Sequence, residues 1–276
     1  KFQGKLVAAG EVLVKFRSGA SGMLRARKTE DAALTQPVGG SGAYLLRSRS
    51  KSAAGLVSSL RANQDVLYVE PNYILQVQVI PNDPQFGEQW PLWNIGQTVL
   101  GLTGMPGADI GSSYAWEWTT GSRDHVVAVL DTGVDQTHPD LINNLWAAPF
   151  GFTVQLGGRT FACPAGTRGF NVIKRTCDPS DDNRHGTQMA GVIGADGNNA
   201  LGIAGVNWIA SVMAVKFLDA KGSGTTSNAI DALEFAVQAK SKGLANVRVI
   251  TASWGDHVNS KALMDAVERA YMHDIL

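Results

Sequence analysis

The feature that most constrains the fold is a regular alternation of two kinds of segment between residues 113 and 274. Short apolar runs, typical of buried strands, alternate with longer amphipathic stretches typical of helices. The expected strands cover 125–131, 211–219 and 247–255, and the expected helices cover 113–119, 185–195, 226–243 and 260–274. This alternation predicts an α/β domain in which helices cover both faces of a mostly parallel sheet. In such sheets, functional groups gather at the carboxyl ends of the strands.

The first eighty residues follow a different pattern, which indicates a small α+β unit. Extended runs at 11–17, 42–49 and 66–80 accompany a helix that begins after Ser52, a residue type suited to capping it. Pro71 lacks the N–H group that a central strand needs, so at least part of the third run is expected at a sheet edge.

A proline-rich stretch, "PNDPQFGEQWP" at 81–91, separates the two patterns and predicts a linker. We therefore expect two domains, residues 1–80 and residues 81–276. They differ in charge, because residues 1–80 carry 11 Lys and Arg against 5 Asp and Glu, a net charge of +6, and residues 81–276 carry −6.

The composition of the whole chain excludes several classes of partner. Lys and Arg number 24, and so do Asp and Glu, so the net charge provides no attraction to nucleic acid or to an anionic membrane. No apolar run approaches the roughly 20 residues that a membrane-spanning helix needs. The apolar stretch in "KFQGKLVAAG" is too short for a signal peptide. We expect neither nucleic acid nor a membrane among the partners.

One expected strand, "VVAVLD", ends on a charged residue. Asp131 follows side chains that belong to the core, and burial of a carboxylate is costly unless a partner pairs with it. His185 is the candidate partner, since it opens a helix of small residues and neutral imidazole is the usual general base near pH 7. A carboxylate bonded to its Nδ1–H would hold the tautomer of the ring. Taken alone, the two residues are equally compatible with a capping Asp131 and a surface His185.

The two cysteines, Cys163 and Cys177, lie in a Gly- and Thr-rich segment. In an oxidising compartment they would close a short loop, and we expect this disulfide. The alternative is two free thiols, because the sequence alone does not determine the compartment.

Four sequence motifs resemble those of a known protein family. "VAVLDTGVDQTHPDL", "HGTQMAGVIGADGNNALGIAGV", "AVKFLDAKGSGT" and "ITASWG" resemble the subtilisin-like serine proteases (subtilases), in the same order and at similar spacing. The resemblance covers about residue 81 to the end of the chain. Residues 1–80, which end in "YVEPNY", resemble the inhibitory propeptide of that family.

The resemblance implies a fold and an activity. The fold would be a three-layer, subtilisin-like α/β domain preceded by a small ferredoxin-like propeptide. The activity would be that of a secreted, extracellular serine endopeptidase, made as a self-inhibited zymogen that cleaves a polypeptide substrate with an Asp-His-Ser triad. The propeptide would act as an intramolecular inhibitor of a monomeric enzyme. Self-cleavage is expected between about Leu75 and Pro81, with Gln76 and Gln78 as unranked candidates.

The resemblance also assigns roles to individual residues. Asp131 would orient the histidine, and His185 would act first as general base and then as general acid. Two segments would bind the substrate backbone as an added strand: Gly222, Ser223 and Gly224 on one side, and Ser253, Trp254 and Gly255 on the other. Taken alone, "GSG" is more typical of a flexible turn.

Calcium is the cofactor that the resemblance implies. Its expected ligands are the side chains of Asp140 and Asn199, backbone carbonyls near Leu201 and Ile203, and the carboxylate of Asp83, which together supply the oxygen atoms that this cation prefers. A second acidic cluster, formed by Asp178, Asp181 and Asp182, would hold another ion or form a solvated loop.

The chain departs from the family pattern in two ways. Arg184 stands where the family usually has Gly, and Gln188 stands where it usually has His. In addition, the motifs that contain the nucleophilic Ser and the Asn of the oxyanion hole in that family do not occur in these 276 residues. We therefore expect a sequence that is cut short, with only two of the three catalytic residues and without useful activity of its own.

Two other functions compete with this interpretation. Asp131-Thr132-Gly133 also matches the active-site word of aspartic proteases, but their mechanism needs two such carboxylates and no second word is present. The other alternative is a catalytically inactive protein of the same fold that binds peptides or acts as an inhibitory scaffold.

Overall fold

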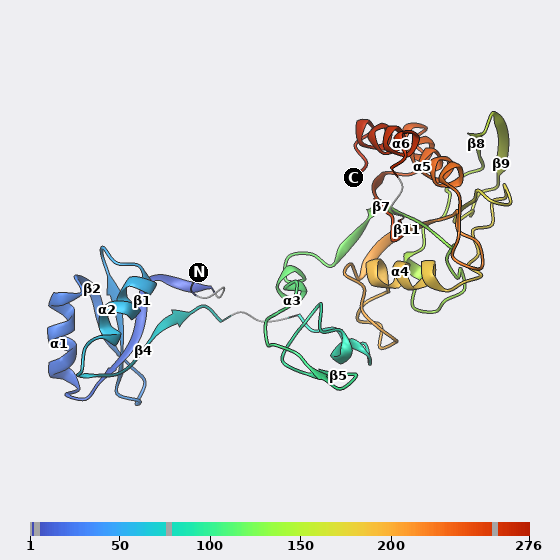
Figure 1. Cartoon of the computed structure of the whole chain (residues 1–276). Helices are drawn as coiled ribbons and strands as arrows, with labels where there is room; N and C mark the ends of the chain where they lie inside the picture. The colour runs from blue at the N-terminus through green and yellow to red at the C-terminus, as the bar shows by residue number, and fades with distance from the viewer. Residues whose placement is uncertain (1, 3–5, 76–78, 256–258) are drawn as a thin grey trace. The chain divides into compact units, whose positions relative to one another are not determined.

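The computed structural model describes residues 2, 6–75, 79–255 and 259–276 of the chain. It divides into two compact units, Lys1–Val77 and Gln78–Leu276 (Figure 1). The cleavage candidates Gln76 and Gln78 lie outside the described residues.

The first unit is a four-stranded antiparallel sheet with two helices. Its elements in chain order are β1 (Val7–Phe16), α1 (Ala20–Thr29), β2 (Ala32–Val38), β3 (Ala43–Ser48), α2 (Ala53–Arg61) and β4 (Val66–Tyr73). The strand order is β2-β3-β1-β4. Val14, Leu46 and Leu56, from β1, β3 and α2, are fully buried in one shared core. This arrangement confirms the expected ferredoxin-like unit.

Local signals explain which elements of this unit the sequence predicts. The Ser52 side chain accepts a hydrogen bond from the Gly55 N–H at 3.1 Å and so caps α2 as expected. Pro71 lies on β4, at the edge of the sheet. The helix α1 was not predicted, because Gly19 at its start forms no side-chain cap and its first turn has no acidic residue.

The second unit contains a four-stranded parallel sheet. Its elements are η1 (Phe86–Glu88), β5 (Thr98–Val99), β6 (Leu102–Thr103), α3 (Ser112–Ala115), β7 (Gly121–Asp131), η2 (Ile142–Asn144), β8 (Phe152–Leu156), β9 (Arg159–Cys163), β10 (Gly169–Asn171), α4 (His185–Gly194), β11 (Ile209–Lys216), α5 (Thr226–Ser241), β12 (Val247–Thr251) and α6 (Lys261–Met272). The strand order is β10-β11-β7-β12. The Leu276 N–H donates to the Arg248 carbonyl and the Ile250 N–H donates to the Leu276 carbonyl, so Leu276 pairs with β12.

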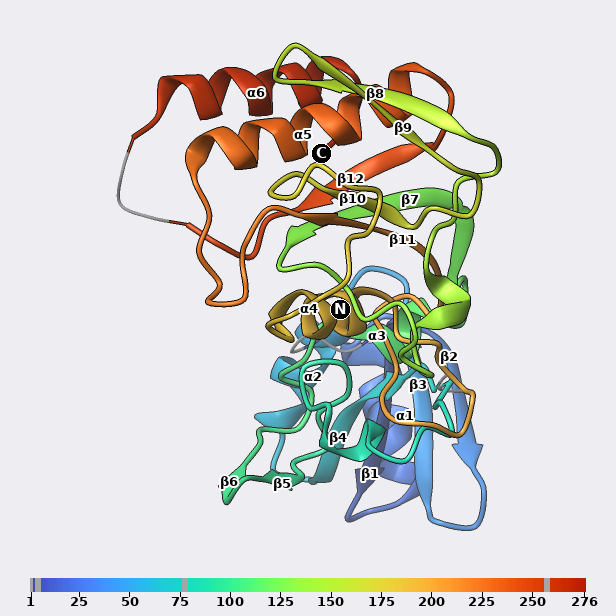
Figure 2. The same cartoon turned by 90° about the vertical axis from the view of Figure 1, so that its right-hand side faces the viewer.

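Helices cover both faces of this sheet, as Figure 2 shows, with α5 and α6 on one side and α4 on the other. Successive residues of β7 alternate between the two sides: Leu130 belongs to the core beneath α5 and α6, and Val129 packs with Ala190 of α4. The expected three-layer α/β arrangement is confirmed.

The proline-rich stretch at 81–91 is not a linker, contrary to the sequence prediction. Phe86 within it is 3% exposed and stacks on Trp93, with ring centroids 5.9 Å apart. Phe86 also contacts Trp116, and both belong to a core cluster with Trp208. Prolines restrict a chain locally, but they do not prevent the large side chains between them from being buried.

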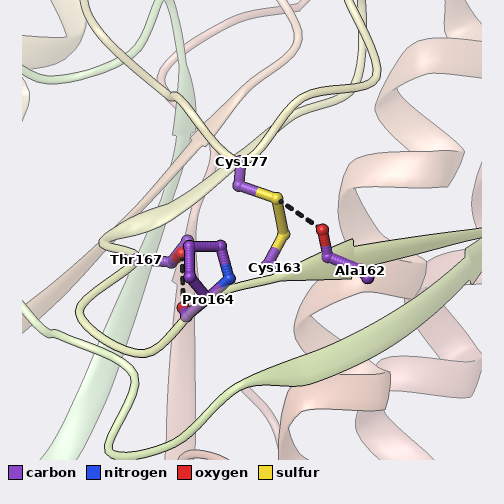
Figure 3. Close-up of a disulfide and its surroundings, with 5 residues drawn as sticks. All are labelled: Ala162, Cys163, Pro164, Thr167 and Cys177. Atoms are coloured by element: carbon purple, nitrogen blue, oxygen red, sulfur yellow. Dashed lines mark hydrogen bonds between the residues drawn. A yellow bond between two sulfur atoms is a disulfide. The ribbon is translucent and has the colours of Figure 1, made fainter.

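The expected disulfide is present and closes a loop beside the β8–β9 hairpin. The hairpin itself was not predicted from the sequence. Cys163 at the end of β9 bonds to Cys177, and the two Cα atoms are 5.6 Å apart (Figure 3). The Sγ atom of Cys177 lies 3.3 Å from the carbonyl oxygen of Ala162. In the chain-entropy model, closing a loop of this size stabilises the folded state by about 3 kcal/mol.

The described residues include no helix that combines the length and the apolar character needed to cross a bilayer.

Candidate active site

Asp131 is the last residue of β7, at the carboxyl end of a central strand, and its side chain is 0% exposed. The Thr132 N–H donates to its Oδ1 at 2.7 Å. The chain then turns at Gly133, whose φ is +105° and where an added Cβ would lie 2.3 Å from the Pro179 carbonyl oxygen. Only glycine fits this turn, which leaves the carboxylate of Asp131 at the end of the sheet.

His185 is the first residue of α4, and the fold brings it to Asp131 across 54 residues of sequence. Its Nδ1 lies 2.8 Å from Oδ1 and 3.0 Å from Oδ2 of Asp131. Because a carboxylate is only an acceptor, Nδ1 carries the proton and Nε2 keeps its lone pair. The imidazole side chain is 41% exposed. The pair can therefore accept a proton at Nε2 and stabilise the resulting imidazolium.

The start of α4 packs directly on the end of β7. An added Cβ on Gly186 would lie 2.1 Å from the Gly133 carbonyl oxygen and 3.1 Å from Cβ of Asp131. Glycine at both positions is thus the local reason why the histidine approaches the aspartate so closely.

Asp181 joins the same two elements from the loop before α4. Its Oδ1 accepts hydrogen bonds from Thr132 Oγ1, Asn183 N and Arg184 N, and its Oδ2 accepts from Thr187 N and Oγ1. Burial would raise the pKa of Asp181, but the hydrogen bonds from Thr187, Asn183 and Thr132 outweigh it and hold the pKa below its ordinary value. The group stays ionised near neutral pH.

Lys216 is a buried cation that the sequence analysis did not single out. It ends β11 and is 2% exposed. Its Nζ donates to the Thr132 carbonyl at 2.5 Å and to the Leu218 carbonyl at 2.9 Å, and it pairs with Asp182 at 2.6 Å. A lysine at the carboxyl end of an otherwise apolar strand was the available signal, since such a charge needs a partner.

The acidic cluster, for which the sequence left open a second ion site or a solvated loop, is divided among protein partners. Asp182 pairs with Lys216, Asp181 binds threonine and backbone donors, and Asp178 accepts from Ser180 and Gln136. No three His, Cys, Asp or Glu side chains in the described part of the chain gather as a metal cluster.

The first expected substrate-binding segment, 222–224, lies in an exposed turn. Gly222 has φ +74°, and its N–H donates to the Asp219 carbonyl at 2.9 Å. The Asp219 N–H in turn donates to the Ser223 carbonyl at 2.8 Å. These residues form no strand in the structure.

The second expected segment, 253–255, follows β12 without regular structure. Its Trp254 is anchored, because Nε1 donates to the Leu130 carbonyl at 2.9 Å and the indole meets Phe217 edge-on at 4.7 Å. Leu130 directly precedes Asp131, so Trp254 lies next to the end of β7.

Asp83 and Asp140, two of the residues expected to bind calcium, both contact a third, Asn199. Asp140 is 3% exposed and Asp83 is 4% exposed. Asp140 accepts from Asn199 Nδ2 at 2.8 Å and from the Ile203 N–H at 3.1 Å, and Asp83 accepts from the Asn199 N–H at 3.3 Å. The Leu201 N–H donates to Asn199 Oδ1 at 2.8 Å. Within the described residues, neither carboxylate has a basic side chain as an ion-pair partner.

Comparisons with known proteins give protease-related matches for both units. Residues 122–276 match the model of the subtilase family, and residues 4–72 match that of the fervidolysin N-terminal prodomain. A thermophilic serine proteinase of Bacillus sp. (strain AK1) is 30% identical over 95% of this chain and 56% of its own length. A cell wall-associated protease of Bacillus subtilis (strain 168) is 31% identical over 73% of this chain and 20% of its own length. The chain thus spans about half, or less, of the length of these relatives.

Among solved structures, a serine protease of Aeromonas sobria in complex with a chaperone superposes with a TM-score of 0.52. The match covers 70% of this chain and 30% of that chain at 23% identity, so it supports the fold.

Proposed function

Because this chain belongs to the subtilase family of serine proteases, we propose that it is the propeptide and the leading part of the catalytic domain of a serine endopeptidase made as a zymogen. The observation that carries the proposal is the contact between the buried Asp131 carboxylate and Nδ1 of His185 at 2.8 Å. The nucleophilic serine is taken to lie outside residues 1–276. The coverage of only 56% of a relative supports this placement.

In the proposed mechanism, Nε2 of His185 removes the proton of the serine hydroxyl as its oxygen attacks the scissile carbonyl carbon. Asp131 stabilises the imidazolium that forms. The imidazolium then protonates the leaving amine, and an acyl-enzyme remains. His185 next takes a proton from water, which attacks the ester carbonyl, and returns that proton to the serine oxygen.

An extended polypeptide is the proposed substrate. Its backbone would bind between residues 222–224 and residues 253–255, with main-chain hydrogen bonds giving affinity. The anchoring of Trp254 beside the end of β7 supports the second of these positions.

Residues 1–80 are the proposed inhibitory propeptide, and residues 81–276 are the proposed part of the catalytic domain. The prodomain match at 4–72 supports this division. Secretion to the extracellular space is supported by the disulfide and by the name of the cell wall-associated relative. The mature enzyme is proposed to be a monomer.

Calcium is the proposed cofactor, and the residues present fit it. Asp83 and Asp140 are buried carboxylates without a basic partner among the described residues, and Asn199 lies against both. Bound there, calcium would neutralise these charges and hold the loop around Asn199 together. The carbonyls of Leu201 and Ile203 are the proposed backbone ligands.

Calcium is therefore expected to stabilise the second unit. At about 100 times its dissociation constant, a ligand that binds only the folded state adds about 2.7 kcal/mol. All seven tryptophans lie in this unit, so tryptophan fluorescence during urea unfolding measures its stability. Asp140→Asn should abolish the calcium effect and Asp178→Asn should preserve it. Equal calcium effects in the two variants would contradict the assignment.

The proposed activity is tested with protein expressed from a gene that extends beyond Leu276. We expect casein cleavage and labelling of one serine by a fluorophosphonate, both lost in His185→Ala and both kept in the exposed control His125→Ala. Peptide binding without labelling or turnover in the longer protein would instead establish the inactive scaffold.

A further inference from the structure

The Asp181 carboxylate connects the two elements that carry the Asp131–His185 pair. Thr132, which follows Asp131, donates to its Oδ1 at 2.8 Å. Thr187, two residues after His185, donates to its Oδ2 through its hydroxyl at 2.6 Å and through its N–H at 3.0 Å. The carboxylate thus spans β7 and α4, which the sequence separates by 53 residues.

The Thr132 hydroxyl completes the connection. While it donates to Asp181, it accepts the N–H of Gly186 at 2.9 Å. The residue after the aspartate is therefore bonded to the residue after the histidine, and Asp181 orients the hydroxyl that makes this bond. The N–H of Thr132 in turn donates to Oδ1 of Asp131, the carboxylate oxygen nearer to Nδ1 of His185.

We propose that Asp181 is a positioning residue that holds the Asp131 carboxylate and Nδ1 of His185 at hydrogen-bonding distance. It touches neither the imidazole nor the proposed substrate, and acts through Thr132, Gly186 and Thr187. The structural role is independent of the proposed function. Only its consequence for catalysis rests on that function.

Both oxygens of Asp181 must be acceptors for this role. Among the described residues, every group hydrogen-bonded to them is a donor: two hydroxyl groups and three backbone N–H groups. A carboxylate accepts at both oxygens, whereas asparagine offers one acceptor and an NH₂ group. In Asp181→Asn the NH₂ group would face hydrogen-bond donors on one side, and the hydrogen bonds on that side would be lost.

The tautomer of His185 is the direct readout. When the Asp131 carboxylate accepts a hydrogen bond from the ring, the proton resides on Nδ1. When this hydrogen bond weakens, the Nε2–H form gains population. Nitrogen-15 NMR of the full 276-residue chain measures this ratio at a pH where the ring is neutral. Both tautomers are uncharged, so removal of a nearby charge has little direct effect on the ratio.

We expect Asp181→Asn to shift the tautomer ratio towards Nε2–H by roughly tenfold, the size expected for loss of one charge-assisted hydrogen bond. Asp178→Asn removes a charge from the same loop without contact to either element, and should leave the ratio unchanged. Asp131→Asn is the reference for the full shift to the Nε2–H form, because its amide would donate to Nδ1 of His185. An unchanged ratio in folded Asp181→Asn would overturn the proposal.

A second pair of variants tests the same connection if Asp181→Asn does not fold. Thr132→Val removes the hydroxyl between Asp181 and Gly186, and Thr132→Ser keeps it. The proposal requires the shift towards Nε2–H in the valine variant and the wild-type ratio in the serine variant. Equal ratios in the two variants would contradict it. Absence of proteolysis in the longer protein would refute the proposed function and leave this result untouched.

Discussion

Asp131→Asn in the proteolytically active, longer protein is expected to lower kcat by about 10⁴. An asparagine amide in place of the carboxylate would donate to Nδ1 of His185, so the ring would carry its proton on Nε2. The lone pair that must accept the serine proton would then point away from the serine. The imidazolium would also lose the buried charge 2.8 Å from its Nδ1.

Active-site titration with a fluorophosphonate, followed by kcat and KM for a peptide substrate, measures this loss. KM should change little, because Asp131 is fully buried and does not contact the proposed substrate positions. Asp135→Asn is the matched control, since that carboxylate lies four residues further along the chain, is exposed and, among the described residues, accepts hydrogen bonds from Thr137 alone. A loss of less than tenfold in Asp131→Asn would refute the role assigned to Asp131.

Phe170→Ala is expected to destabilise the second unit by about 3–5 kcal/mol. Phe170 lies on β10, the edge strand of the parallel sheet, and is 0% exposed. Its ring stacks on Phe235 of α5 with centroids 5.4 Å apart and contacts Phe161 of β9 at 5.8 Å. Truncation would remove these contacts and leave a cavity between the sheet, the helix and the hairpin.

Urea unfolding followed by tryptophan fluorescence isolates this effect, because the first unit contains no tryptophan. Phe150→Ala is the control: that ring is 54% exposed, and its loss should cost less than about 1 kcal/mol. Similar losses in the two variants would show that the core around β10 is not packed as described.

The main elements of the fold were predictable because their signals are local. Apolar runs marked β7, β11 and β12, amphipathic periodicity marked α5 and α6, and a capping serine marked α2. Elements without such signals were missed. The strand β10 has three residues, and α1 begins at Gly19 without a side-chain cap.

Prediction of the site followed the same division. Asp131 and His185 were identified from the end of an apolar strand, the start of a helix and the family motifs around them. Lys216 and Asp181 were not assigned a role at the site, because a buried lysine or a loop aspartate has no meaning until its partners are known. Arg184 and Gln188, the two residues that differ from the family pattern near His185, are exposed, so neither side chain is buried against the pair.

By itself, the sequence determined the type and order of most elements, the division into an α+β and an α/β unit, and the two residues of the candidate pair. Periodicity, caps and turns depend on residues a few positions apart, so a single chain reveals them. Only the tertiary structure decided that the proline-rich stretch packs into a core and that Lys216 binds the Thr132 carbonyl. It alone decided that Asp181 bridges β7 and α4. These contacts join residues far apart in the chain, and they form only when burial of the surrounding side chains offsets the entropy of closing the loops between them.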